Sequence, residues 1–210
     1  MVAGVGIAAP DHTALDGAFA VDTTTAVARI TAAIGVLMVL ALAGDDITGT
    51  ARESETYALL LFSTAGIMVL AGTDDLLVLA TGYLLASIPL YGLIGLSRSG
   101  LAAEAAMKTY LFGITLLLGV TVLYGISGAT RYNELAARLP GAPAAVVATG
   151  VVAVAAGLMF EAGGVPAHFW VPDAAQAANS FAAVFLTTVP KIGALIALYR
   201  VATVLPGTVA

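Results

Sequence analysis

Among the ionisable side chains in the long apolar stretches of this 210-residue sequence, three stand out at membrane depth: Lys108, Glu161 and Lys191. A charged side chain in hydrocarbon costs at least about 2.5–3.5 kcal/mol, even on permissive insertion scales. Residues kept at that cost usually carry protons or ions, or form buried ion pairs. We therefore expect these three positions to hold most of the functional information in the chain.

Lys191 lies midway along its apolar stretch, directly after Pro190 and close to Thr187 and Thr188. Proline has no N–H, so Pro190 frees the carbonyl of Leu186. A free carbonyl and two hydroxyls can hold water beside the ammonium, and a lysine kept from bulk water can exchange its proton. The pattern favours a proton relay. A structural ion pair with a carboxylate of a neighbouring helix is the alternative.

Glu161 and His168 are seven residues apart, so they share one helix face if the helix continues that far. One interpretation is a pair that exchanges protons near neutral pH. The other places Glu161 at the membrane interface and makes His168 an anchor beside Trp170, since aromatic residues favour headgroup depth. The residues alone favour neither interpretation.

Glu104 and Lys108 have the i,i+4 spacing of a modestly stabilising helix pair. That structural role is favoured over a relay role, although both charges lie in an apolar segment. Arg29 and Arg200 lie near the ends of apolar stretches, where their side chains can reach the headgroups.

The sequence contains six apolar stretches of about 20 residues, and each is long enough to cross a hydrocarbon core of about 30 Å as a helix. We predict an all-α integral membrane protein with one domain over residues 1–210. The spans are expected at about 25–44, 56–72, 76–96, 101–126, 144–163 and 180–205, with a polar loop over 127–143.

The composition agrees with a membrane protein, because 60% of residues are apolar and only 10% are charged. The net charge of -5 excludes a basic nucleic-acid surface, and the absence of Cys excludes disulfides and thiolate metal sites. With two His, a metal site is not expected. Residues 1–10 lack a basic region, so no signal peptide is expected.

A break is predicted after the fifth helix, at about 164–176, where the sequence PAHFWVPD (Pro166 to Asp173) comes shortly after two glycines. Non-helical backbone at membrane depth must be buried in protein or line a wet cavity. Interrupted helices beside buried charges are common at ion-coupling sites. An ordinary interfacial loop is the alternative.

At these residues the chain resembles the antiporter-like membrane subunits of respiratory complex I, most closely the subunit N type. The segment EAGGVPAHFWVPDAAQAANSFAAVFLTTVPKIGALIALY matches the family's break and the lysine-bearing helix that follows it. Three further stretches agree, ETYALLLFSTAGIMVLA, GYLLASIPLYGLIG and EAAMKTYLFGITLLLG. Their order and spacing match over nearly the whole chain.

The resemblance implies a proton-translocating subunit of about fourteen helices in two inverted repeats. This chain would supply one flanking helix and the first repeat. It implies partners among the other membrane subunits of a complex I-type or Mrp-type assembly, in a bacterial or archaeal cell membrane. No cofactor is expected in this chain, whereas quinone, FMN and iron–sulfur clusters are expected elsewhere in the parent complex.

The resemblance also implies site residues, although the match is uneven. The family has a lysine at the positions of Lys191 and Lys108, and a histidine at the position of His168. Leu84 replaces the family glutamate, and Glu161 replaces the central lysine. The expected proton pathway is therefore Lys191, Glu161, His168 and Lys108, supported by Pro190, Glu104, Thr187 and Thr188.

Three functions follow from these residues and this resemblance. The favoured one is proton translocation, in which Glu161 pairs with Lys191 in place of the family's glutamate–lysine pair. The second is a non-conducting structural paralogue, and the third is an independent small transporter that dimerises.

Overall fold

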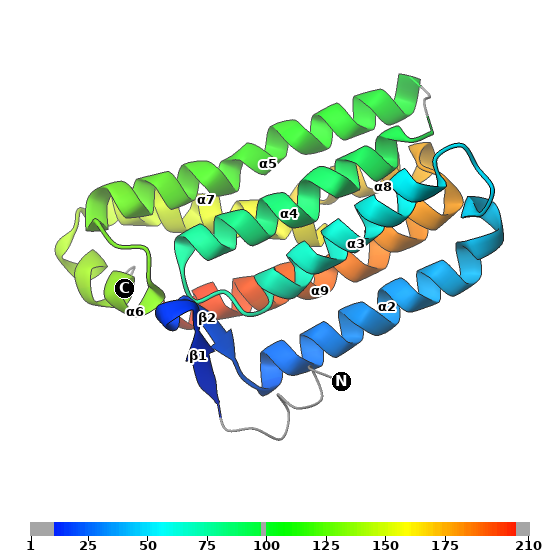
Figure 1. Ribbon diagram of the computed structural model, residues 1–210. Helices are drawn as coiled ribbons and strands as arrows, with labels where there is room; N and C mark the ends of the chain where they lie inside the picture. The colour runs from blue at the N-terminus through cyan, green and yellow to red at the C-terminus, as the bar shows by residue number, and fades with distance from the viewer. Residues whose placement is uncertain (1–10, 98–99, 205–210) are drawn as a thin grey trace.

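The computed structural model of the chain describes residues 11–97 and 100–204, without the side chains of residues 106, 108–112 and 167. In this part of the chain, six long helices run side by side in one bundle (Figure 1). They are α2 (Thr23–Ile47), α3 (Glu53–Leu70), α4 (Leu76–Gly95), α5 (Gly100–Ser127), α7 (Ala144–Ala162) and α9 (Ser180–Val204). The predicted all-α fold is confirmed.

Among the described residues, α2, α4, α7 and α9 are each long and apolar enough to cross a membrane, and α5 contributes a shorter apolar segment, Gly113–Ser127. The outer face of α2 is apolar as well, with Leu37, Met38 and Leu42 between 59% and 79% exposed. Outward-facing apolar side chains of this kind suit contact with lipid.

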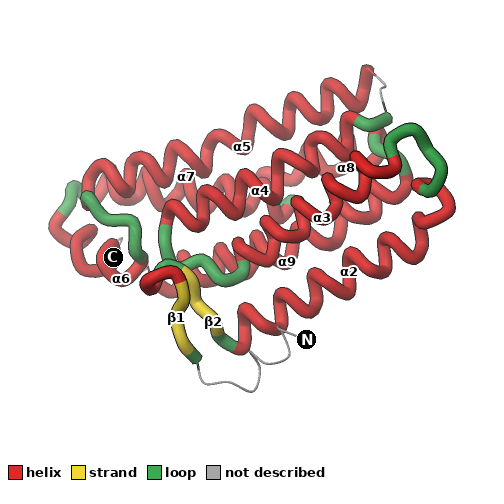
Figure 2. The backbone as a smooth tube through the Cα atoms, viewed as in Figure 1, coloured by secondary structure: helices red, strands yellow, loops and turns green. Residues whose placement is uncertain are grey.

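Shorter elements lie at the two ends of the bundle and inside it (Figure 2). They are strands β1 (His12–Ala14) and β2 (Phe19–Val21), helices α6 (Tyr132–Arg138) and α8 (Trp170–Ala177), and the 3-10 turns η1 (Leu15–Gly17), η2 (Leu139–Gly141) and η3 (Ala167–Phe169). β1 and β2 pair antiparallel, with His12 opposite Val21.

Aspartates fix where two of the helices begin. The Asp22 carboxylate accepts a hydrogen bond of 2.7 Å from the Thr25 N–H at the start of α2. The Asp75 carboxylate accepts from the N–H groups of Leu77 and Val78 at the start of α4. These caps satisfy N–H groups that have no partner within the helix, and they place both starts within two residues of the predicted ones.

Glycines bring neighbouring helices into close contact. A Cβ added to Gly66 of α3 would lie 2.2 Å from the backbone nitrogen of Ala86 in α4. A Cβ added to Gly157 of α7 would lie 2.5 Å from the Cβ of Leu116 in α5. In a bilayer, where lipid is as apolar as leucine, close approach of this kind is a principal source of helix association.

Two predicted irregular segments contain helices. The expected loop 127–143 holds α6, which forms because Tyr132 and Leu135 bury against the bundle and Arg138 pairs with Glu134 at 3.1 Å. The expected break 164–176 is narrower than predicted, because η3 and α8 occupy most of it. Pro172 lies in the first turn of α8, where the missing proline N–H costs no hydrogen bond.

Arg200 is ion-paired, and the expectation that its side chain reaches out to the headgroups is wrong. Its guanidinium lies 2.7 Å from the Asp22 carboxylate and also donates to the Thr25 hydroxyl and the Ala71 carbonyl. Its side chain is only 13% exposed. The ends of α2, α3 and α9 are therefore tied together at one end of the bundle.

The Asp22–Arg200 pair predicts a pH-dependent stability. Burial raises the pKa of Asp22, but hydrogen bonds from Thr25 and Arg200 outweigh it and hold this pKa below its ordinary value of 3.8. A lowered carboxyl pKa adds stability above pH 3.8, and this stability is lost as the pH falls through the lowered pKa. We expect Asp22→Asn to cost about 2 kcal/mol at neutral pH, and the difference from wild type to disappear in acid.

Thermal unfolding in detergent over a pH series measures this difference. Asp16→Asn is the matched control, since Asp16 also pairs with an arginine, Arg131, but its side chain is 94% exposed. Exposed pairs contribute little. Equal losses for both variants at neutral pH would contradict the role given to Asp22.

Candidate functional site

The ammonium of Lys191 lies inside the bundle at the C-terminal end of α7. Lys191 Nζ donates a hydrogen bond of 3.2 Å to the backbone carbonyl of Glu161. That carbonyl is available because α7 ends at Ala162, and the last carbonyls of a helix have no partner within it. The negative end of the helix dipole also favours a cation at this place.

Gly163 makes room for the ammonium. It ends α7 in the left-handed conformation, with φ 69°. A Cβ at this position would lie 3.0 Å from Lys191 Nζ and 2.8 Å from a methyl carbon of Val171. Glycine is therefore required here both by the backbone and by the close approach of the lysine.

Trp170 forms one wall of the site. Its ring centroid is 4.9 Å from Lys191 Nζ, within the range of a cation–π interaction. The indole N–H donates a 2.7 Å hydrogen bond to the Phe160 carbonyl, and the ring stacks on that of Phe160 with centroids 5.3 Å apart. Trp170 is 1% exposed, so its ring is buried in the bundle. The role of His168 as an anchor stays a prediction.

The Glu161 carboxylate turns away from Lys191 towards α4. Its Oε2 accepts a 2.8 Å hydrogen bond from the Ser87 hydroxyl, and the residue is 1% exposed. Among the described residues, no ion pair joins this carboxylate to the Lys191 ammonium. The two residues do meet as predicted, but through the backbone of Glu161.

The break lies between α7 and α8, and α8 runs on to the end of the bundle where α4 ends. There the Ser97 hydroxyl donates a 2.7 Å hydrogen bond to the carbonyl of Ala177. The helical path from α7 to α8 is thus interrupted beside Lys191, and Lys191 itself lies near the middle of α9. This arrangement favours an interrupted helix beside a buried charge over an ordinary interfacial loop, and its depth in the membrane stays a prediction.

His168 does not share a helix face with Glu161, because Gly163 ends the helix that would have placed them together. It lies in η3 with an exposed side chain. Thr187 and Thr188 are exposed too, and their hydroxyls donate to carbonyls of their own helix at 2.8 and 2.7 Å. The supporting role of these two hydroxyls beside Lys191 stays a prediction. Pro190 is buried in α9.

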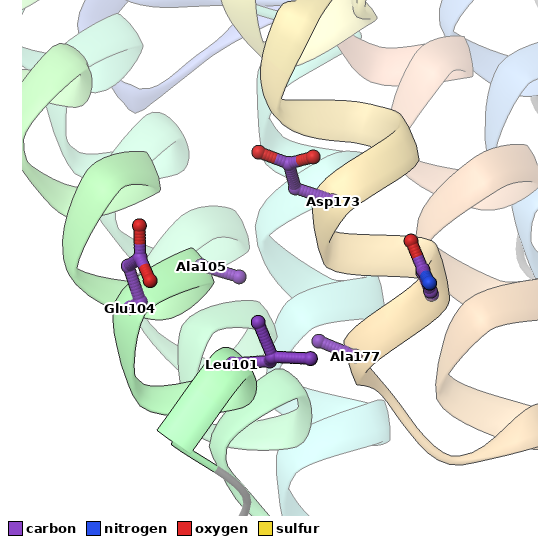
Figure 3. Close-up of a pocket in the computed structure, with 6 residues that line it drawn as sticks. Leu101, Glu104, Ala105, Asp173 and Ala177 are labelled. Carbon is purple, nitrogen blue, oxygen red and sulfur yellow. The ribbon is translucent and has the colours of Figure 1, made fainter.

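Glu104 lines a cavity between α5 and α8 with a volume of about 240 Å³ (Figure 3). The cavity is lined by Leu101, Glu104, Ala105, Asp173, Gln176 and Ala177. Lys108 belongs to α5, and its side chain lies outside the described residues. The described residues contain no group of three or more His, Cys, Asp or Glu side chains able to hold a metal ion.

Sequence reasoning missed Ser87 and the neighbouring Tyr83 of α4, which is 1% exposed. Leu84, at the position where the family resemblance places a glutamate, is 37% exposed on the outer side of α4. The polar groups of α4 that face Glu161 are therefore hydroxyls.

Replacing Gly163 by alanine is expected to lower stability and to disturb the ammonium. The left-handed backbone alone costs an alanine about 1–2 kcal/mol, and the added methyl meets Lys191 and Val171. Gly49→Ala is the matched control, because Gly49 has φ 75° and open space around it. Thermal unfolding of both variants should show a larger loss for Gly163→Ala. Equal losses would contradict the close approach of Lys191.

Comparisons with known proteins agree with this geometry. The family model described as NADH:quinone oxidoreductase/Mrp antiporter, TM, matches residues 73–209. NADH-quinone oxidoreductase subunit N of Mycobacterium sp. (strain JLS) is 66% identical over 213 residues, covering 100% of this chain and 45% of that protein. The chain therefore spans less than half the length of this relative.

Two solved structures are similar as well. A chain of respiratory complex I from Thermus thermophilus has a TM-score of 0.76 and 30% identity, covering 91% of this chain and 42% of that chain. A chain of the Mrp complex from Dietzia sp. DQ12-45-1b has a TM-score of 0.72 and covers 89% of this chain and 36% of its own length. At 23% identity, the second likeness concerns the fold alone.

Proposed function

Because this chain belongs to the NADH:quinone oxidoreductase/Mrp antiporter family of membrane subunits, we propose that it is the proton-translocating part of a complex I-type subunit N. The resemblance read from its motifs is confirmed by the family match. The chain is a multi-pass protein of the bacterial inner membrane.

The observation that carries the proposal is the setting of Lys191. Its ammonium is held at mid-bundle by a neutral carbonyl and an aromatic ring. A buried ion pair resists the loss of either partner, because the remaining charge is then uncompensated. A lysine held by neutral groups can release its proton without leaving such a charge, and this favours a relay over a locked pair.

Glu161, His168 and Lys108 are the other proposed members of the pathway. Glu161 supplies the carbonyl that holds the Lys191 ammonium, and its carboxyl group is a second proton-binding group one residue from the break. His168 is exposed at the break, where it can exchange protons with groups outside this half of the protein. Lys108 is proposed from the resemblance alone.

The proposed partners are the remainder of the subunit and the other membrane subunits of a complex I-type assembly. The share of the Mycobacterium relative that this chain covers, 45%, leaves room for a second repeat. Quinone, FMN and iron–sulfur clusters would belong to other subunits of that assembly, with no redox group in this chain.

The test is the number of protons moved per electron in proteoliposomes that contain the intact assembly. We expect Lys191→Ala to lower this ratio while NADH oxidation continues, because one relay group is lost. Arg138→Ala removes a cation from the half-exposed surface of α6 and should leave the ratio unchanged. An unchanged ratio in an assembled Lys191→Ala protein would remove Lys191 from the mechanism.

A structural, non-conducting role is the second candidate, and one observation favours it. The position of the family glutamate is the apolar and outward-facing Leu84, and the Glu161 carboxylate is bound to Ser87. This role predicts that Glu161→Gln combined with Lys191→Met preserves both assembly and proton flux. Loss of flux with intact assembly would exclude it.

A further inference from the structure

Ser87 of α4 uses its hydroxyl group differently from the threonines of the long helices. A serine or threonine inside a helix commonly donates to the carbonyl four residues earlier in the same helix. Thr64, Thr81 and Thr121 do so at 2.7–2.8 Å. Ser87 instead donates across to α7, to Glu161 Oε2 at 2.8 Å, and both residues are 1% exposed. The Ser87 hydroxyl therefore helps to fix where the Glu161 side chain lies.

The Glu161 carboxyl group has bonding capacity left for another partner. Its second oxygen, Oε1, is buried and has no hydrogen-bond partner among the described residues. An ionised carboxylate accepts hydrogen bonds on both oxygens. Within the part of the chain that the structure describes, the hydrogen bond from Ser87 is thus the contact that holds this carboxyl group on the α4 side.

The Lys191 ammonium lies within reach of the same carboxyl group. Nζ is 3.2 Å from the backbone oxygen of Glu161, and bond lengths of about 1.23 Å for C=O and about 1.52 Å for Cα–C place it at most about 6 Å from the Glu161 Cα. A glutamate carboxyl group turns about three side-chain bonds. An ammonium has three N–H donors, and only one is used on this carbonyl among the described residues. Opposite charges attract strongly inside a protein, so an ion pair would form if the carboxylate were free to turn.

We propose that Ser87 is a positioning residue, which holds the Glu161 carboxyl group on α4 and so prevents an ion pair with the Lys191 ammonium. In such a pair the lysine could not release its proton without leaving a buried carboxylate uncompensated. With the carboxyl group held on α4, Lys191 keeps its neutral partners and stays able to exchange its proton. This role in proton movement rests on the proposed function, whereas the placement of the carboxyl group does not.

A density map of the intact assembly carrying Ser87→Ala tests the placement. The substitution removes one oxygen atom and with it the hydrogen bond to Glu161. We expect a carboxyl oxygen of Glu161 to move to within about 4 Å of Lys191 Nζ, the distance of an ion pair. A carboxyl group that stays on the α4 side, for example at the Tyr83 hydroxyl, overturns the proposal.

Ser63→Ala is the matched control. Ser63 of α3 is also buried and also donates from one helix to another, at 2.7 Å to the Ala86 carbonyl of α4. Its hydroxyl bonds to the backbone of α4, so we expect the Glu161 carboxyl group to stay with Ser87 in this variant. A carboxyl group that moves equally in both variants would be responding to a shift of α4, and this result also overturns the role given to Ser87.

The number of protons moved per electron tests the effect on the relay. We expect Ser87→Ala to lower this ratio as Lys191→Ala does, because the paired lysine no longer exchanges its proton. In a Glu161→Gln background, Ser87→Ala should lower the ratio no further, since no carboxylate is left to pair with Lys191. A hydroxyl that mattered only for packing would cause the same loss in both backgrounds, and that result contradicts the proposal.

The density maps need no turnover, so the two tests fail separately. If Lys191→Ala leaves the ratio unchanged while the carboxyl group moves in Ser87→Ala, the proposed function fails and the positioning role of Ser87 stands. If Lys191→Ala lowers the ratio while the carboxyl group stays on α4 in Ser87→Ala, the positioning role alone is refuted.

Discussion

Replacing Trp170 with alanine is expected to destabilise the protein by about 3 kcal/mol and to reduce proton flux. In water-soluble cores this truncation costs about 3–5 kcal/mol. Here we expect the lower end, since lipid is itself apolar and part of the transfer term is absent. The remaining cost comes from the cavity, from the lost stacking on Phe160, and from the loss of the indole N–H that donates to the Phe160 carbonyl.

The effect on flux follows from the contact with Lys191. The ring lies 4.9 Å from the ammonium, and a desolvated cation–π contact contributes up to about 2 kcal/mol. Unfolding in detergent and proton uptake by proteoliposomes measure the two effects. Phe62→Ala is the control, because that ring is 58% exposed. A Trp170→Ala protein as stable as this control would contradict the structure of the site.

Replacing Gly66 with valine is expected to prevent α3 and α4 from packing, with a loss of more than about 3 kcal/mol or failure to assemble. A Cβ at this position would lie 2.2 Å from the Ala86 nitrogen and 2.5 Å from the Leu85 carbonyl carbon. Both are backbone atoms, so relief requires the helices to move apart. Ser63 would then lose its 2.7 Å hydrogen bond to the Ala86 carbonyl.

Gly44→Val is the matched control for this substitution. Gly44 is also a helical glycine, in α2, and has no atom within 4 Å of its added Cβ. It should cost only the helix preference of valine, which is below about 1 kcal/mol relative to alanine. The level of folded protein in membranes and its unfolding temperature compare the two. Equal behaviour would show that α3 and α4 do not approach as closely as described.

The long helices could be predicted from the sequence because uninterrupted apolar runs of about 20 residues have few alternatives in a membrane. The helix starts at Thr23 and Leu76 could also be predicted to within two residues, since an aspartate precedes each. The short helices α6 and α8 were not predicted. Their sequences are polar or rich in proline, and they are helical because Tyr132 and Trp170 bury against the bundle.

The site could be predicted only in part. Lys191 and Glu161 were found because charges in apolar runs stand out, but their mode of contact depends on where α7 ends. Gly163 was the available signal for that end. Ser87 gave no signal, because a single serine in an apolar helix usually bonds to its own backbone.

The Asp22–Arg200 pair was missed for a different reason. Each residue lies next to the end of a predicted span and is unremarkable alone. The start of the first span and the end of the sixth must, however, lie on the same side of the membrane, because the chain crosses it an even number of times between them. This parity alone places both charges at one end of the bundle, where they can pair.

The proposed relay requires that water reaches the Lys191 ammonium. A density map of the intact assembly, at a resolution that shows ordered water, tests this requirement most directly. We expect water within hydrogen-bond distance of Lys191 Nζ, continuing along the break between α7 and α8. An ammonium enclosed by acyl chains or by close-packed apolar side chains, without water, would contradict proton transfer at this residue.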